Sequence, residues 1–546
     1  MNFDRRELLT TTLLAAGSRL LGDDPEQLGR YFKPAGTDAR PLPSFEATRR
    51  LLPSPVFDEK PEYVEAYWKA WEIAFRNFYV PPPGSGFVSP FIDAAFNQSI
   101  FLWDTCFMTM FCNYGYPLVP GIGSLDNFYA RQHEDGEISR EIIRNTGKDY
   151  QQWTNQEGSP LFSRSGWRRG SRNQRVMYVG RTPPAANPRL TLDAFNHPIF
   201  TWAELESFRV TGDRDRLRRI WEPLCRYYRA FQNYVRQGNG LYMTDWASMD
   251  NSPRNEFLDQ GGVAVDTSAE MVLFARQMAA IGKIVGKNQE ARSFLRDAED
   301  VTACINRLMW DPQAKFYFDL DHNGRRAPVK TVAAFWTLLA GVASKDQLQD
   351  LAAELQNSAS FGRMNRVPTC SATEKDFDPK GGYWKGAVWS PTTTMVVRGL
   401  ENYGQSQLAA EIALNHLDLV TAVYKSTGTI WENYAPDSAS PGTPAKRDFV
   451  GWSGIAPIAY LLEYTIGLRP DAERNELSWR LRSRRRTGCE RFRFNGHTVD
   501  LAADPENGRT RIVVNSDGVF RLKVAMAGFE FKHDIHSGKQ TFVIGG

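Results

Sequence analysis

The sequence is poor in cysteine and histidine, and it contains no long apolar run. Its 546 residues include 6 cysteines and 7 histidines. The cysteines show neither paired metal-ligand spacing nor a dense disulfide pattern, and the histidines form no His-Glu-x-x-His or His-x-His motif. No stretch reaches the ~18 uninterrupted apolar residues of a membrane-spanning helix. We therefore expect no metal centre, no disulfide scaffold and no membrane span.

An excess of charge of one sign is also absent. The 66 basic and 63 acidic side chains leave a net charge of +3, which gives no electrostatic case for a nucleic acid partner. The chain has no Gly-x-Ser-x-Gly elbow, phosphate loop or dinucleotide fingerprint. These absences favour a weakly charged or neutral small-molecule ligand and chemistry without a cofactor.

Aromatic side chains are plentiful by contrast. They make up 12% of the chain, with 15 tryptophans, and 42% of all residues are hydrophobic. Such a chain can bury a large core, and most single tryptophans are expected to lie in it. The remainder could offer flat apolar faces to sugar rings, which makes carbohydrate the ligand class to consider first.

The N-terminal segment, residues 1–25, resembles a twin-arginine export signal. Arg5 and Arg6 precede an apolar stretch and a finish of small residues. The acidic Asp4 and Glu7 depart from that pattern, so an ordinary N-terminus is the alternative. Export predicts a periplasmic or secreted protein, and its absence a cytoplasmic one. An N-terminal extension is expected over residues 26–59.

Helical periodicity dominates residues 60–470. Apolar residues recur on one helical face in several stretches, namely 64–78, 217–235, 271–285, 301–309 and 348–355. Long polar loops, such as 151–188 and 357–382, separate some of them. Many helices joined by alternating short and long connections suit a toroid of helical hairpins whose loops build a pocket at one end.

The pattern changes to alternation after Pro470, which predicts a small β domain over residues 471–546. Alternating apolar residues occur at 492–494 and 520–524, with turn signals at Asn495-Gly496 and Asp517-Gly518. A cluster of five arginines between 480 and 486 leads into this region. It is either a basic patch or a solvated strand edge.

Two carboxylates, Asp250 and Glu432, lie in short polar segments beside aromatic residues. Asp250 lies in the segment Trp-Ala-Ser-Met-Asp-Asn-Ser-Pro-Arg of residues 246–254, and Glu432 lies in Trp-Glu-Asn-Tyr of residues 431–434. In such segments, burial can raise the pKa of one carboxyl while neighbouring donors keep the other carboxyl ionised. A general acid and a general base require this difference. The alternatives are an N-cap or turn role for Asp250 and a surface position for Glu432.

Four segments in the same order carry a family resemblance. They are Phe-Leu-Trp-Asp-Thr at 101–105, the segment around Asp250, Gly-Gly-Tyr-Trp-Lys-Gly-Ala-Val-Trp at 381–389, and Trp-Glu-Asn-Tyr at 431–434. The chain resembles the mannosylglycerate hydrolase-like enzymes of glycoside hydrolase family 63, with trehalases as more distant relatives. The resemblance implies a mainly α fold, an (α/α)6 toroid of the six-hairpin glycosidase type, with the small C-terminal β domain outside the match.

The resemblance also assigns roles to residues. It implies that Asp250 is the general acid and Glu432 the general base, and that the other matched segments line the sugar-binding subsite through Trp103, Asp104, Tyr383, Trp384, Lys385 and Trp389. The chain departs from the family at Lys385 and Ala387, where Arg and Pro are usual. Lys keeps the charge of Arg but loses its two-pronged hydrogen bonding, so the pattern of sugar hydroxyls recognised can differ.

Further side chains near the motifs remain candidates. Asp245, Glu256 and Asp448 could orient the site, or replace the acid if the alignment is slipped. Arg254 is expected either to pair with a carboxylate or to contact substrate. His197 is expected either in a substrate contact or as a buried, hydrogen-bonded histidine.

The sequence thus predicts an inverting, exo-acting α-glycosidase that hydrolyses a small α-glucoside or α-mannoside, with one carboxylate as proton donor and the other activating water. A sugar epimerase or polysaccharide lyase on the same toroid is one alternative. A non-catalytic carbohydrate-binding protein is another. The sequence gives no indication of the oligomeric state.

Overall fold

The computed structural model describes residues 28–149, 197–243, 249–258 and 262–545, apart from positions 39, 95, 96, 135, 507 and 527. The expected export signal and the polar loop 151–188 lie outside these residues, as does Asp245. Within the described ranges, no helix has the length and apolar character needed to cross a membrane.

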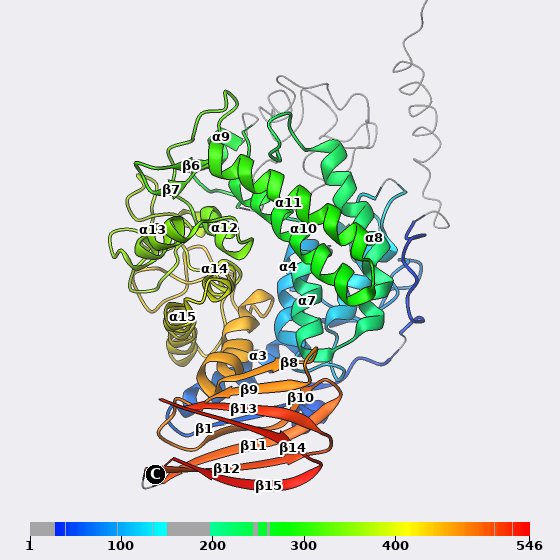
Figure 1. The fold of residues 1–546 in the computed structure, drawn as a ribbon, viewed down its shortest axis with the longest axis vertical. Helices are drawn as coiled ribbons and strands as arrows, with labels where there is room; N and C mark the ends of the chain where they lie inside the picture. The colour runs from blue at the N-terminus through cyan, green and yellow to red at the C-terminus, as the bar shows by residue number, and fades with distance from the viewer. Residues whose placement is uncertain are drawn as a thin grey trace, which may run out of the picture.

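Helices form most of the described chain up to residue 466 (Figure 1). The α-helices are α2 (Phe45–Thr48), α3 (Pro61–Phe75), α4 (Leu102–Cys112), α5 (Asp126–Ala130), α7 (Phe200–Thr211), α8 (Arg214–Tyr234), α9 (Asn255–Leu258), α10 (Val265–Val285), α11 (Asn288–Leu308), α12 (Trp336–Leu339), α13 (Lys345–Gln356), α14 (Ser390–Asn402) and α15 (Ser406–Thr427). Shorter 3₁₀ turns are η1 (Arg49–Leu51), η2 (Ile122–Leu125), η6 (Val332–Phe335), η7 (Tyr383–Lys385) and η8 (Trp452–Gly454), and η9 (Ile455–Ile466) is π-helical.

The helices expected from apolar periodicity are confirmed at α3, α8, α10, α11 and α13. Local signals explain several of their ends. Ser344 caps α13 in a reciprocal arrangement with Gln347, and Gly286 ends α10 at a φ of 85°, which an L side chain rarely adopts. Phe78 continues the apolar stripe of α3 but lies beyond its end, in strand β2. Apolar periodicity therefore predicted these helices, but it extended α3 beyond its end at Phe75.

Short two-stranded ribbons accompany the helices. They are β2 (Phe78–Tyr79) with β3 (Phe91–Ile92), β4 (Ser99–Phe101) with β5 (Glu141–Ile143), and β6 (Trp310–Asp311) with β7 (Phe316–Tyr317). The pair β4–β5 leads directly into α4, because Leu102 follows Phe101 without a break. This ribbon sets the position of the Trp103-Asp104 segment at the start of that helix.

The C-terminal region is a pair of sheets (Figure 1). Its strands are β8 (Leu468–Asp471), β9 (Glu476–Arg480), β10 (Thr487–Phe494), β11 (His497–Glu506), β12 (Arg509–Ser516), β13 (Phe520–Met526), β14 (Phe529–Ile535) and β15 (Gly538–Ile544). One sheet has the order β1-β10-β11-β12-β15 and the other β14-β13-β9-β8. The turn at Asn495-Gly496 joins neighbouring strands, whereas Asp517-Gly518 leads from the first sheet into the second.

A strand from the N-terminal part completes the first sheet. β1 (Ser54–Phe57) pairs antiparallel with β10, placing Val56 opposite Gly488. The β region therefore draws on residues within the expected 26–59 extension, and its second sheet begins at Leu468. A helical region followed by a β-rich C-terminal region agrees with the predicted fold class.

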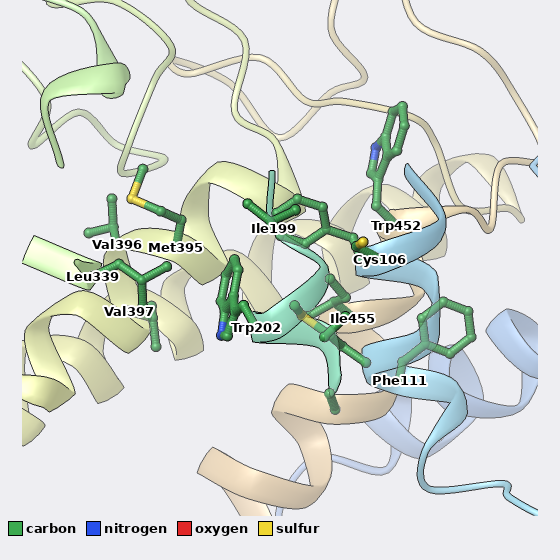
Figure 2. Packing of buried hydrophobic residues seen from close by; sticks show 14 of the residues in the cluster. Cys106, Phe111, Ile199, Trp202, Leu339, Met395, Val396, Val397, Trp452 and Ile455 are labelled. Atoms are coloured by element: carbon green, nitrogen blue, oxygen red, sulfur yellow. The ribbon is translucent and has the colours of Figure 1, made fainter. Parts of the chain in front are cut away.

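The helical core brings the segments of the site together. Figure 2 shows buried side chains from several elements gathered around Trp202 of α7, among them Cys106 and Phe111 of α4, Val396 of α14 and Ile455 of η9. Trp202 packs edge-on against Phe107, with ring centroids 5.4 Å apart. Trp452 lies in this core and also reaches the candidate site. Close packing of this kind holds the attached loops rigidly.

Candidate active site

Glu432 is a buried carboxylate on the loop that follows α15. Its Oε1 accepts a hydrogen bond from the Tyr383 hydroxyl at 3.0 Å, and its Oε2 accepts one from the backbone N–H of Lys446 at 2.8 Å. The Glu432 carbonyl accepts bonds from the Trp452 indole N–H and the Ser453 hydroxyl, each at 3.1 Å. The protein thus fixes both the backbone and the carboxylate orientation of this residue.

The same surroundings set its proton affinity. Burial raises the pKa of Glu432 above its usual range, and the negative charge of Asp250 raises it further. The hydrogen bonds from Lys446 and Tyr383 act in the opposite direction by stabilising the ionised form. A carboxylate whose pKa is raised is a stronger base than one in water, as proton abstraction from a water molecule requires.

Asp250 lies in a turn after the end of the α8 segment, with an exposed side chain. The next residue fastens this turn to the 381–389 segment, because Asn251 Oδ1 accepts from the backbone N–H of Trp384 at 2.9 Å and its Nδ2 donates to the Gly382 carbonyl at 3.0 Å. The charge of Asp250 acts on Glu432, Tyr383 and Asp104. Segments distant in sequence therefore bring the two predicted carboxylates into electrostatic range.

Aromatic rings surround these groups. Trp384 stacks on Trp389 with centroids 4.3 Å apart and an interplanar angle of 10°. Trp103 of α4 lies edge-on to Trp384 at 6.4 Å and to Trp452 at 6.0 Å. Trp389 is completely buried and donates its indole N–H to the Tyr383 carbonyl at 3.3 Å. It thus supports Trp384 and Tyr383 from behind and presents no surface of its own, unlike the wall residue expected from sequence.

Asp104 lies in the first turn of α4 next to Trp103. Burial raises the pKa of its carboxyl to about 8, and the charges of Asp93, Asp250 and Glu141 contribute to the rise. The group is therefore mostly protonated at pH 7. A neutral carboxyl both donates and accepts hydrogen bonds, whereas an ionised carboxylate only accepts them.

Arg254 lies beneath the Asp250 turn and is fully buried. Its guanidinium binds both oxygens of Asp266, at 2.5 and 2.9 Å, and Asp319 at 2.8 Å. Of the two roles expected from the sequence, the structure shows the pairing with carboxylates. With no exposed surface, Arg254 holds the base of the turn and does not face a ligand.

His197 is also a buried, hydrogen-bonded side chain. Its Nδ1 lies 2.6 and 2.7 Å from the two carboxylate oxygens of Glu270. Its ring stacks on Trp336, with centroids 6.2 Å apart, and lies 5.8 Å from Trp103. Burial raises the pKa of Glu270 to about 7, against the lowering effect of the histidine. The pair supports the back of the aromatic cluster.

The remaining candidates lie further from this centre. Lys385 is half-buried, and its charge acts on Cys370, opposing the burial that raises the pKa of that thiol. Glu256 is exposed on α9, and Asp448 is exposed and accepts a hydrogen bond from the Thr429 hydroxyl. In the part of the chain that the structure describes, no group of three His, Cys, Asp or Glu side chains could hold a metal ion.

The sequence interpretation missed Trp452. This residue links the Glu432 carbonyl to Trp103, and its centroid lies 5.7 Å from that of Trp389. The only local signal was a tryptophan between Gly451 and Ser453, just before the apolar η9 segment. Because its role depends on a contact across 20 residues of loop, periodicity could not reveal it.

Comparison with known proteins also indicates a glycoside hydrolase. A model of the mannosylglycerate hydrolase MGH1-like glycoside hydrolase domain matches residues 151–453. An uncharacterized protein of Borreliella burgdorferi is 26% identical over 340 residues, which cover 60% of this chain and 71% of that protein.

Solved structures share the fold at lower identity. A family 63 mannosylglycerate hydrolase from Thermus thermophilus, solved with glucose, is 20% identical with a TM-score of 0.54, covering 72% of this chain and 99% of that one. A family 78 rhamnosidase from a Bacillus species is 14% identical with a TM-score of 0.56, covering 89% of this chain and 43% of that one. The resemblance inferred from the four segments is thereby confirmed, and since the domain match spans more than half of the chain, the protein belongs to the mannosylglycerate hydrolase MGH1-like glycoside hydrolases.

Proposed function

We propose that the protein is an inverting, exo-acting α-glycosidase that hydrolyses a small α-glucoside or α-mannoside. One observation carries the proposal: the Glu432 carboxylate is oriented by two hydrogen bonds and lies within electrostatic range of Asp250, and its partners Tyr383 and Trp452 pack against Trp384 and Trp103. A glycosidase needs one carboxyl to donate a proton and one to accept it, with apolar ring faces nearby to hold the sugar.

In the proposed mechanism, Asp250 donates a proton to the departing glycosidic oxygen. Glu432 takes a proton from a water molecule, which attacks the anomeric carbon from the opposite face of the ring. Such an arrangement requires the two carboxyl groups to be ~6.5–9.5 Å apart when substrate is bound. The exposed position of Asp250 suits contact with an aglycone, and the buried position of Glu432 suits an enclosed water molecule.

The fold proposed for this activity is the (α/α)6 toroid. Its support is the similar fold of the Thermus thermophilus mannosylglycerate hydrolase, together with the placement of Asp250 and Glu432 on loops that follow long helices, α8 and α15. The name of that hydrolase points to an α-mannoside of glycerate as the first substrate to test. A terminal sugar would enter between the loops at one end of the toroid.

The test is hydrolysis of a panel of α-glucosides and α-mannosides, including their glycerate conjugates and trehalose. We expect release of free sugar by the wild type, with the anomeric configuration of the first-formed product inverted when followed by NMR. The Asp250→Asn and Glu432→Gln variants should each lower kcat by about 10²–10⁴-fold, because each removes one proton transfer.

Glu256→Gln is the matched control, because Glu256 is an exposed carboxylate on α9, six residues after Asp250. It should retain wild-type turnover. Full turnover by Asp250→Asn or Glu432→Gln would show that another carboxylate performs the step. A product with retained configuration would contradict the inverting mechanism.

The positions of His197 and Glu432 do not favour the epimerase or lyase alternative. It required a site centred on His197 with Glu432 turned outward, whereas His197 is buried against Glu270 and Glu432 is buried against Tyr383. A non-catalytic binding protein would retain the aromatic cluster but has no need of a carboxylate held by two hydrogen bonds.

A further inference from the structure

A second cleft lies where the helical region meets the four-stranded sheet β14-β13-β9-β8. Its volume is about 750 Å³, within the range that holds a small ligand. Its walls come from α7, α10, α14, the start of α15, the end of η9 and strands β8, β9, β13 and β14. Figure 1 shows β8 and β9 along the border with the helices. None of the candidate active-site residues lines it.

Most acidic groups of this cleft are already paired. Glu463 binds Arg398 at 2.6 Å, Arg209 at 3.1 Å and Arg469 at 3.4 Å. Further pairs join Glu401 to Arg469, Glu476 to Lys523, and Asp471 to Arg474. Glu530 binds Lys532 at 2.8 Å, and Glu473 is exposed and acts on Arg474. These carboxylates therefore neutralise cations other than the two at the end of β9.

Those two cations are Arg480 and Arg482, members of the arginine cluster noted in the sequence. They line the cleft two residues apart, and Leu481 between them is buried and does not line it. Among the described residues, no ion pair or side-chain hydrogen bond joins either guanidinium to a carboxylate. All five arginines of the cluster are exposed, but Arg484, Arg485 and Arg486 lie outside the cleft.

Like charges are concentrated around Arg482. Burial lowers the pKa of its guanidinium, and the positive charges of Arg480 and Arg469 lower it further. Across the sheet, Ser478 of β9 lies opposite Arg469 of β8 and Lys523 of β13, both of which are paired with carboxylates. Ser406, the first residue of α15, also lines the cleft, and a helix N-terminus carries partial positive charge.

We propose that this cleft is a second ligand site, which binds an oxyanion-bearing ligand of sugar size through Arg480 and Arg482. An arginine fork matches the geometry of a carboxylate or a phosphate, and a bound anion would relieve the repulsion among the gathered cations. The shared chemistry is the oxyanion, which a uronic acid or a sugar phosphate could supply. The site is separate from the proposed glycosidase centre and does not depend on it.

The test is binding of glucuronate, glucose 6-phosphate, inorganic phosphate and neutral glucose to the full-length protein, measured by calorimetry at constant ionic strength. We expect one or more of the anions to bind in a salt-dependent manner and glucose not to bind in this cleft. The double variant Arg480→Gln/Arg482→Gln should raise the Kd for that anion about tenfold or more. Tighter binding of glucuronate identifies an acidic sugar, and tighter binding of either phosphate compound identifies a phosphate ligand.

The matched control is Arg484→Gln, which removes one charge of the same cluster outside the cleft and should leave the Kd unchanged. Thermal unfolding of the double variant without ligand checks its folding, and we expect an unchanged or higher Tm because like-charge repulsion is relieved. Blocking the glycosidase centre with Glu432→Gln should leave anion binding intact. The proposal is overturned if no anion binds the wild type, or if the double variant and Arg484→Gln lose binding equally.

Discussion

The carboxyl of Asp104 links the stability of the protein to pH, because desolvation raises its pKa. Its pKa is about 8 in the folded protein, against about 3.9 in an unfolded chain. Between those values the folded state holds a proton that the unfolded state has released, so the free energy of unfolding falls as pH rises, by up to about 1.4 kcal/mol per pH unit.

In the Asp104→Asn variant, the free energy of unfolding should not fall in this way as pH rises. We expect it to be more stable than the wild type at pH 8, by up to a few kcal/mol, and nearly equal to it at pH 4. Urea unfolding at the two pH values measures the difference. Asp215→Asn, at an exposed position on α8, is the control and should show no such pH dependence. An equal difference between Asp104→Asn and wild type at both pH values would mean that the carboxyl is ionised in the folded state.

Tyr383 positions the proposed base through one hydrogen bond. Its hydroxyl donates to Glu432 at 3.0 Å and lowers the pKa of that carboxyl. In Tyr383→Phe the pKa of Glu432 should therefore rise, and the acidic limb of the kcat/KM profile should move to higher pH by about one unit. The pH profile of purified enzyme measures the shift. Tyr403→Phe, which loses a hydrogen bond to the distant Ala343 carbonyl, should leave the profile in place.

At the residue scale, the local sequence predicted which side chains belong to the candidate site better than it predicted the environment of each side chain. Asp250, Glu432, Trp103 and Tyr383 could be selected because carboxylates and aromatics stood together in short motifs. The protonated state of Asp104 could not be predicted, since it results from burial and from charges on three other segments. A buried, hydrogen-bonded His197 was one of two alternatives from the sequence, but its partner Glu270, 73 residues away, could not be predicted.

At the scale of elements, Asn251 joins two loops that carry the site. Its side chain both accepts from Trp384 and donates to the Gly382 carbonyl, so the Asp250 turn and the 381–389 segment move together. Asn251→Ala should lower kcat by about tenfold or more, because a displaced acid loses its alignment with the bond to be cleaved. Because Asn251 is exposed, the Tm should change little.

Steady-state kinetics and thermal unfolding of Asn251→Ala separate the two effects. Asn323→Ala, on an exposed turn between Asp321 and Gly324, is the matched control and should affect neither quantity. A large fall in Tm with proportionate loss of activity would indicate that Asn251 stabilises the fold as a whole and has no specific role in aligning the loops.

Elements differ in how far sequence predicts them. The amphipathic stripe of α8 or α11 repeats every 3.6 residues within one segment, so it can be recognised from the local sequence. The pairing of β1 with β10 joins residues more than 400 positions apart, and the Asp517-Gly518 turn sends the chain into a different sheet. Partners in a sheet are chosen by packing across the whole fold, for which an alternating pattern carries no signal.

At the scale of the whole molecule, a buried ionic network joins the helical region to the β region. Glu463 on η9 binds Arg398 of α14, Arg209 of α7 and Arg469 of β8. Burial alone would raise the pKa of Glu463, but the three arginines outweigh it and hold the pKa well below its usual range. The stabilisation is therefore present above pH ~4.3 and is lost as pH falls toward that lowered pKa.

Replacing Glu463 by Gln should destabilise the protein by about 3–5 kcal/mol at pH 7, because it leaves buried arginines without their shared partner. Urea unfolding measures this loss. The control is Glu411→Gln on α15, whose pair with Arg366 spans 3.5 Å at a largely accessible position and should contribute about 0–1 kcal/mol.

Since the network bonds both regions, the wild type should unfold in one transition, and Glu463→Gln should separate the unfolding of the β region from that of the helices. A single transition at unchanged urea concentration in Glu463→Gln would mean that other contacts hold the two regions together, among them the hydrogen bond from the buried Trp479 indole N–H to the Ile466 carbonyl.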